Sequence, residues 1–222
     1  MTDPLKIDFV SDVTCPWCAV GLGALEQALE KLSDEISVEI DFQPFELNPG
    51  MAPEGQDIVE HLTQKYGSTE AQQADVRKML CERGAQVGFE FNPDGRGRIW
   101  NTFDAHRLLH LAAVEGQAGQ QAALKKALLS ACHTRSERMG DHAVLLACAV
   151  EAGLDEPRAR AVLDGEEYCT EVRERMSFYT SRGITSVPAV VINDKHLISG
   201  GQPAEVFEQA IRQIAGEGTA DS

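Results

Sequence analysis

The chain has 222 residues, of which 20 are Lys or Arg and 35 are Asp or Glu, so its formal net charge at pH 7 is −15. This charge opposes binding to nucleic acid and to anionic membranes, which both require basic surfaces. Hydrophobic residues make up 43% of the chain, enough for a buried core. The longest apolar run, residues 143–150, is far shorter than the roughly 18 residues of a membrane-spanning helix, and residues 1–6 carry no secretory signal pattern. We therefore expect a cytoplasmic protein with neither a nucleic-acid nor a membrane partner.

The first fifty residues predict a strand–helix–strand unit. Residues 6–11 (KIDFVS) and 37–42 (SVEIDF) are rich in β-forming residues. Between them, residues 16–32 carry apolar side chains at helical spacing, and Pro16 suits the first turn of a helix. A unit of this kind places two parallel strands side by side.

Residues 56–174 predict a series of helices. Apolar side chains recur at helical spacing around residues 58–66, 76–80, 108–112, 124–128 and 144–146. Glycines at positions 67, 84, 116, 119, 153 and 165 are candidate helix ends. The one candidate strand in this stretch is Phe89–Phe91.

The C-terminal region restores the β pattern. Residues 187–200 (VPAVVINDKHLISG) predict a hairpin around an Asn-Asp-Lys turn. A last helix is expected from Pro203 and Ala204, with a frayed tail from Gly216. Because the two β-containing ends are too short to fold separately, we expect one α/β domain (βαβ … ββα) from residues 1–50 and 178–222, with residues 51–177 inserted as a helical domain.

The candidate site is Cys15-Pro16-Trp17-Cys18, where the first strand gives way to the first helix. Unpaired N–H groups at a helix N-terminus stabilise a thiolate and lower a cysteine pKa from its usual value of about 8.5. Cys18 follows one turn later, so it can attack a mixed disulfide formed at Cys15. The pattern predicts a reversible dithiol–disulfide couple with Cys15 as the nucleophile.

The remaining cysteines are interpreted as small buried hydrophobic residues of the expected helices, with a redox role left open. They are Cys81, Cys132, Cys148 and Cys169. Cys15 and Cys18 could form half of a zinc site, but no second C-x-x-C or H-x₃₋₅-H motif completes it. No metal is expected.

Four sequence blocks resemble the DsbA-like thioredoxin-fold oxidoreductases of the FrnE type. They are SDVTCPWCAVG at 11–21, FELNP at 45–49, NTFDAHRL at 101–108 and GITSVPAVVINDKHLISGGQ at 183–202. The resemblance implies a thioredoxin fold interrupted by a helical domain, with the active site in the cleft between them. It also implies that Cys15 is the nucleophile, Cys18 the resolving thiol and Pro188 a cis-proline beside them. The backbone of Val187 would then pair with an extended substrate as an added strand.

Further candidate substrate contacts lie inside the motif and in the other three blocks. Pro16 and Trp17 belong to the dithiol motif itself. Asn48 is either a turn former or a pocket residue, and Asn101 is either a helix N-cap or a cleft residue. His106 is either a group that acts on substrate or a structural histidine.

Three classes of function agree with these observations. The first is a thiol–disulfide oxidoreductase for extended peptides, protein thiols or small thiols, with no required cofactor and with glutathione as a candidate exchange partner. The second is a glutathione-dependent enzyme similar to 2-hydroxychromene-2-carboxylate isomerase and kappa-class glutathione transferases, which usually carry serine at the position of Cys15. The third is a binding or chaperone-like protein that uses the cleft for extended peptides. The sequence defines neither the natural substrate nor the oligomeric state.

Overall fold

A four-stranded sheet forms the centre of the protein, whose computed structural model describes the backbone of residues 4–220 and the side chains of residues 4–216. Residues 1–3 of the N-terminal segment and residues 221–222 of the tail lie outside this range. Every side chain from Ile7 to Ser11 of strand β1 (Leu5–Ser11) is buried, so β1 must be covered on both faces. The strand order β2-β1-β5-β6 places it inside the sheet.

The strand–helix–strand unit is confirmed. Helix α1 (Pro16–Leu32) connects β1 to β2 (Val38–Pro44), which runs parallel to it. The hairpin is also confirmed: β5 (Ala189–Ile192) pairs antiparallel with β1, and β6 (His196–Ser199) pairs antiparallel with β5. Asn193, Asp194 and Lys195 connect the two strands, and Asn193 and Asp194 have φ angles of +51° and +57°, which suit a tight hairpin turn.

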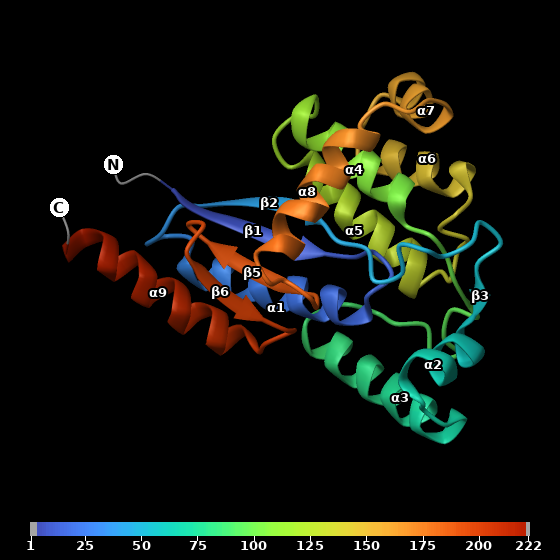
Figure 1. Cartoon of the computed structure of the whole chain (residues 1–222). Helices are drawn as coiled ribbons and strands as arrows, with labels where there is room; N and C mark the ends of the chain where they lie inside the picture. The colour runs from blue at the N-terminus through green and yellow to red at the C-terminus, as the bar shows by residue number, and fades with distance from the viewer. Residues whose placement is uncertain (1–3, 221–222) are drawn as a thin grey trace.

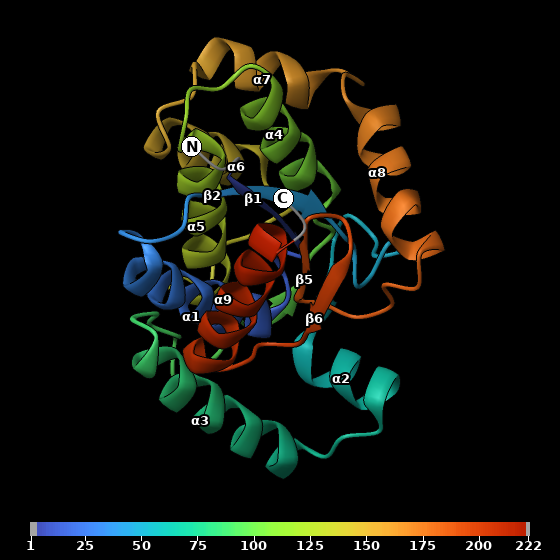
Figure 2. The ribbon, with the colours of Figure 1, turned by 90° about the vertical axis from the view of Figure 1, so that its left-hand side faces the viewer.

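The helices cover the sheet on both faces (Figures 1 and 2). Helices α1 and α9 lie on one face, with α3 packed against α1, while α4, α5 and α8 contact β2 on the other. The remaining helices are α2 (Ile58–Tyr66), α3 (Glu70–Gln86), α4 (Phe103–Val114), α5 (Gln120–His133), α6 (His142–Glu151), α7 (Glu156–Asp164), α8 (Cys169–Ser181) and α9 (Ala204–Ala220). The α/β class with a large helical insertion is confirmed, whereas the domain limits at residues 50 and 178 stay a prediction.

Two expectations within the inserted region are wrong. Phe89–Phe91 is not a strand; the short strands there are β3 (Gln56–Asp57) and β4 (Arg98–Ile99). Gly84 does not end a helix, because α3 continues to Gln86. A Cβ at Gly84 would lie 2.5 Å from the carbonyl oxygen of Phe89. A glycine at this position therefore allows the backbone at Phe89 to pack directly against α3.

The C-terminal helix is longer than expected. The backbone of α9 remains helical past Gly216 to Ala220. Within the described residues, none of the helices combines the length and apolar character needed to cross a membrane.

A buried arginine joins α7 to α4. The guanidinium of Arg107 is almost fully buried and donates hydrogen bonds to the backbone carbonyls of Val162, Gly165 (2.6 Å) and Glu167 (2.9 Å). It also pairs with Asp104 at 2.8 Å. Val162 lies in the last turn of α7, Gly165 is the C-cap of this helix and Glu167 follows it, so these carbonyls have no intrahelical donor.

We expect Arg107→Met to lower the free energy of unfolding by roughly 3–5 kcal/mol, because three carbonyls would lose their donor inside the protein. Denaturant unfolding measures the loss. The control is Arg160→Met, which removes an exposed pair with Glu156 worth about 0.5 kcal/mol. Equal losses in the two variants would contradict a stabilising role of the buried hydrogen bonds of Arg107.

Candidate active site

The dithiol lies where β1 passes into α1, as the sequence predicts. Cys15 is the N-cap of α1, and Pro16 occupies its first turn. The backbone N–H of Cys15 donates to the carbonyl of Asp12 (3.2 Å), and the N–H of Cys18 donates to the carbonyl of Cys15 (3.1 Å). Both cysteines are free thiols, 4% and 0% exposed. Cys15 is therefore the more accessible of the two at the start of the helix.

The pKa values of the two thiols are shifted in opposite directions. A hydrogen bond from Cys18 lowers the pKa of Cys15, assisted by the backbone N–H groups of Cys18 and Trp17, while burial and the charge of Asp12 act against this. Burial raises the pKa of Cys18, and the neighbouring Cys15 raises it further. The arrangement favours a thiolate at Cys15 beside a protonated Cys18.

The segment before β5 contacts the same sulfur. The Val187–Pro188 peptide is cis, as expected, and the thiol of Cys15 donates to the carbonyl oxygen of Val187 at 3.5 Å. A Cβ at Gly21 would lie 3.0 Å from Cγ of Pro188, so glycine allows α1 to pack closely against the proline without displacing it. The structure thus brings together two blocks that are more than 160 residues apart in the sequence.

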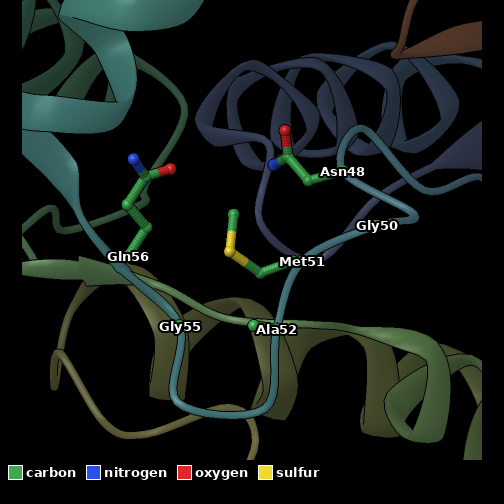
Figure 3. A pocket seen from close by; sticks show the side chains of 6 residues that line it. All are labelled: Asn48, Gly50, Met51, Ala52, Gly55 and Gln56. Carbon is green, nitrogen blue, oxygen red and sulfur yellow. The ribbon is translucent and has the colours of Figure 1, made fainter.

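The loop after β2 forms a hollow of about 380 Å³ on the surface (Figure 3). Asn48 lines it and accepts a hydrogen bond from Nζ of Lys65 at 2.7 Å. Asn101 accepts from the N–H of Phe103 (2.9 Å) and donates to the carbonyl of Met51 (3.5 Å), but the N-cap of α4 is Thr102 and not Asn101. Both asparagines therefore hold this loop in place, and their predicted contact with substrate stays untested.

Tyr66, at the end of α2, lies within electrostatic reach of the dithiol. The side chain of Tyr66 is 62% exposed. Partial burial raises its pKa, and the negative charge of Cys15 raises it further. Trp17 is partly buried, and its carbonyl would lie 3.2 Å from a Cβ at Gly201. Tyr66 was missed by the sequence analysis, because an exposed residue at the end of an amphipathic helix carries no recognisable pattern.

Asp12 is the central polar residue behind the dithiol, and the sequence analysis did not single it out. Its fully buried carboxylate accepts hydrogen bonds from the N–H of Thr14 (3.1 Å), the N–H of Leu47 (2.7 Å) and the hydroxyl of Thr102 (2.8 Å). Burial raises its pKa, but the nearby His106 and the backbone N–H groups of Leu47 and Thr14 outweigh burial and lower the pKa below its usual value. Asp12 is therefore a fixed negative charge.

His106 lies directly behind this carboxylate. Its Nε2 is 3.6 Å from Oδ1 of Asp12, an ion-pair distance, and has no hydrogen-bond partner among the described residues. Burial lowers the pKa of His106, although Asp12 opposes the shift. The side chain is only 2% exposed, so it packs against Asp12 instead of reaching an open surface. Its predicted contact with substrate stays untested.

Glu46 is a second residue that the sequence analysis missed. Burial and the charge of Asp12 raise the pKa of Glu46 to about 7, whereas Arg173 acts in the opposite direction. Its Oε1 atom has no hydrogen-bond partner within the described chain. A carboxyl that titrates near neutrality next to a candidate site is itself a candidate functional group. In the sequence it looks like an ordinary solvated loop glutamate.

The other cysteines lie in helices, as expected, but only two of them are buried. Cys132 and Cys148 are buried, and burial raises the pKa of both thiols, that of Cys148 to about 11. Cys81 and Cys169 are only half-buried; Cys81 still packs against the hydrophobic core, whereas the interpretation of Cys169 as a buried hydrophobic residue is wrong. Within residues 4–216, no group of three or more His, Cys, Asp or Glu side chains is arranged to hold a metal ion.

A dithiol at the start of the first helix, beside a cis-proline before an antiparallel hairpin, defines a thioredoxin-type fold with a helical insertion. The chain belongs to the family of DSBA-like thioredoxin domains, which it matches over residues 6–212. It is 36% identical to a probable DsbA oxidoreductase from Streptomyces coelicolor, with a TM-score of 0.88 over 96% of this chain and 91% of that one.

Two further proteins are similar over almost the whole chain. The uncharacterized protein YwbO of Bacillus subtilis (strain 168) is 28% identical over 212 residues, which are 95% of this chain and 96% of YwbO. A 2-hydroxychromene-2-carboxylate isomerase shares the fold at 14% identity, with a TM-score of 0.70 over 98% of this chain and 99% of that one. The fold is therefore shared by proteins with different chemistry.

We expect Asp12→Asn to lower the stability of the protein and to make the thiol of Cys15 more acidic. The amide has one acceptor oxygen where the carboxylate serves three donors, so the free energy of unfolding should fall by roughly 2–3 kcal/mol. Removing the negative charge should lower the pKa of Cys15 further, because Asp12 raises it. Denaturant unfolding and the pH dependence of alkylation measure the two effects. The control is Asp8→Asn, which alters a buried carboxylate bonded to Gln43 at 2.8 Å and should affect stability alone.

Glu46 should make stability depend on pH near neutrality. Its pKa is raised on folding from 4.5 to about 7, so the folded state loses stability as the pH rises through this window. We expect Glu46→Gln to remove that loss, about 1 kcal/mol after solvent screening of a partly exposed carboxyl. Unfolding measured across the window tests this, with the exposed Glu82→Gln as the control. A difference between Glu46→Gln and wild type that does not change with pH would contradict the assignment.

Proposed function

We propose that the protein is a thiol–disulfide oxidoreductase in which Cys15 attacks and Cys18 resolves. The observation that carries this proposal is the pair of free thiols at the N-terminus of α1, with Sγ of Cys15 3.5 Å from the carbonyl oxygen of Val187 before the cis-proline. Cys15, the more exposed of the two thiols, is acidic and Cys18 beside it is protonated, as a mixed-disulfide mechanism requires.

The reaction can be written from these two sulfurs. The thiolate of Cys15 attacks one sulfur of a substrate disulfide, forming a mixed disulfide and releasing the other sulfur as a thiolate. Cys18 then loses its proton and attacks Sγ of Cys15, which forms the Cys15–Cys18 disulfide and releases the second substrate thiolate. The substrate gains two electrons and the protein loses two. The reverse sequence oxidises a substrate dithiol.

Substrate would approach over Val187, whose carbonyl already contacts Cys15. An extended peptide could pair with the backbone there, between Trp17 and the loop of Asn48. The proposed substrates are protein or peptide thiols and small thiols, with glutathione as an exchange partner and no further cofactor. The proposed location is the cytoplasm, and membership of the FrnE subgroup is part of the same proposal.

The alternative is a glutathione-dependent isomerase or transferase, which the shared fold of 2-hydroxychromene-2-carboxylate isomerase supports. In that class a single hydroxyl or thiol at position 15 would activate glutathione, and Cys18 would be dispensable. Equilibration of the protein with defined ratios of reduced and oxidised glutathione separates the two. A single two-electron couple favours the oxidoreductase, whereas a pair of unresponsive thiols favours the alternative.

The decisive experiment traps the intermediate. In Cys18→Ser the mixed disulfide at Cys15 cannot be resolved, so incubation with a disulfide-containing peptide should leave a stable covalent adduct visible by mass spectrometry. The matched control, Cys15→Ser, should give none, and the alkylation of its remaining motif thiol should require a higher pH. Adducts on Cys18 in the Cys15→Ser protein, formed as fast as those on Cys15, would refute the assigned roles.

A further inference from the structure

One face of α5 runs beneath the dithiol loop. Gln121 accepts a hydrogen bond from the N–H of Phe42 (3.0 Å) and donates to its carbonyl (3.1 Å). Three turns further along, Nε2 of His133 donates to the carbonyl of Val13 at 3.0 Å. Lys125 lies between these two anchors at four-residue spacing from Gln121, so its side chain projects from the same face.

Lys125 is buried completely and has no hydrogen-bond partner in the part of the chain that the structure describes. Its side chain is 0% exposed, and Nζ makes no hydrogen bond within the described residues. Leu129, one turn further along α5, packs in the same hydrophobic cluster as Cys15 and Cys18. An ammonium group in such a place is unfavourable unless a negative charge lies close by, so burial lowers the pKa of Lys125.

The charged and titratable groups around Lys125 come from four segments. Those that favour its ammonium form belong to α1 and the β1–α1 loop, while the two histidines on α4 and α5 disfavour it when charged. They are Cys18 on α1, Asp12 and Cys15 in the β1–α1 loop, His106 on α4 and His133 on α5. Helix α6 and strand β2 also pack on α5, but in the described chain neither supplies a group that shifts Lys125.

The charge near Lys125 changes with the oxidation state of the dithiol. Asp12 is negative in both states, whereas Cys15 is uncharged in a disulfide and acquires a negative charge when the disulfide is reduced. Electrostatic interactions are strong in a buried setting such as this one. The free energy of protonating the amine therefore becomes more favourable on reduction.

We propose that reduction of the Cys15–Cys18 disulfide is coupled to protonation of Lys125. The inference rests on the proposed redox couple. Two electrons convert the disulfide into a thiolate at Cys15 and a thiol at Cys18, taking up one proton, and the neutral amine of Lys125 takes up a second. Two reduced glutathione molecules supply these two electrons and two protons and become oxidised glutathione. Lys125 acts through the cysteines and is a positioning residue.

The test compares the wild type with Lys125→Met, which keeps the length of the side chain and removes the amine. When oxidised glutathione oxidises the dithiol, the two glutathione thiols formed require two protons. If Lys125 is coupled, the reduced protein supplies both, and the equilibrium constant changes little with pH. In Lys125→Met the protein supplies one, so the constant should fall about tenfold per pH unit above the pKa of Cys15 and below about pH 8.

Lys126→Met is the matched control. This neighbouring lysine is 55% exposed and pairs with Glu26 at 2.6 Å on the surface. The equilibrium constant of the Lys126→Met variant with glutathione should keep the pH dependence of the wild type. A purely structural effect of Lys125→Met would change stability, which unfolding of the oxidised protein measures, but would not change the number of protons exchanged with the disulfide.

A direct measurement on the wild type does not depend on any variant. Above the pKa of Cys15, the reduced dithiol itself binds one proton, whereas dithiothreitol frees two on oxidation. Coupling predicts that the protein takes up both, so an indicator in weak buffer should show almost no net release. Release of about one proton per disulfide would overturn the proposal. So would equal pH dependence in wild type and Lys125→Met, which would leave the redox couple itself standing. A wild-type dithiol that fails to equilibrate with glutathione would overturn both proposals.

Discussion

The position of the dithiol depends on one buried carboxylate, that of Asp12. Its two oxygens hold three segments that are distant in sequence: the β1–α1 loop at Thr14, the loop after β2 at Leu47, and the start of α4 at Thr102. A neutral acceptor could not serve three donors as strongly, because hydrogen bonds to a charged group are about twice as strong as neutral ones. The cost is a permanent negative charge behind a cysteine that must itself become negative.

The structure offsets this repulsion in two ways close to Cys15. The hydrogen bond from Cys18 and the free N–H groups at the start of α1 both favour the thiolate. The first of these depends on Cys18 being protonated, which its burial ensures. The same burial that keeps Cys18 protonated therefore makes Cys15 acidic, and the two thiols form one electrostatic unit.

Much of the fold could be predicted from the sequence, because its strands and helices have strong local patterns. The βαβ unit, the hairpin and the position of Cys15 at the start of α1 follow from apolar spacing, Pro16 and the Asn-Asp turn. Phe89–Phe91 was wrongly predicted as a strand, because its alternating aromatic residues are typical of one. In the structure these residues pack against α3 and His133 instead of pairing with another strand.

The polar groups behind the dithiol could not be predicted, since their burial arises only from the tertiary structure. Lys125 and Lys126 are adjacent in an amphipathic helix, and no local pattern tells which one is buried. The structure turns Lys125 toward the dithiol and Lys126 toward Glu26 at the surface. Glu46 is a similar case, because its raised pKa depends on Asp12, a residue that is distant in the sequence.

These polar groups come largely from the inserted helices. Thr102 at the start of α4, Lys125 on α5 and His133 at the end of α5 all act on the β1–α1 loop, and none belongs to the thioredoxin-type core. The insertion is therefore part of the electrostatic environment of the dithiol as well as a cover for the sheet. Two chains with the same Cys-Pro-Trp-Cys motif but a different residue at the position of Lys125 would place different charges behind the same sulfurs. Because the acidity of a thiol and the stability of its disulfide depend on that charge, the motif alone does not determine the redox properties of the site.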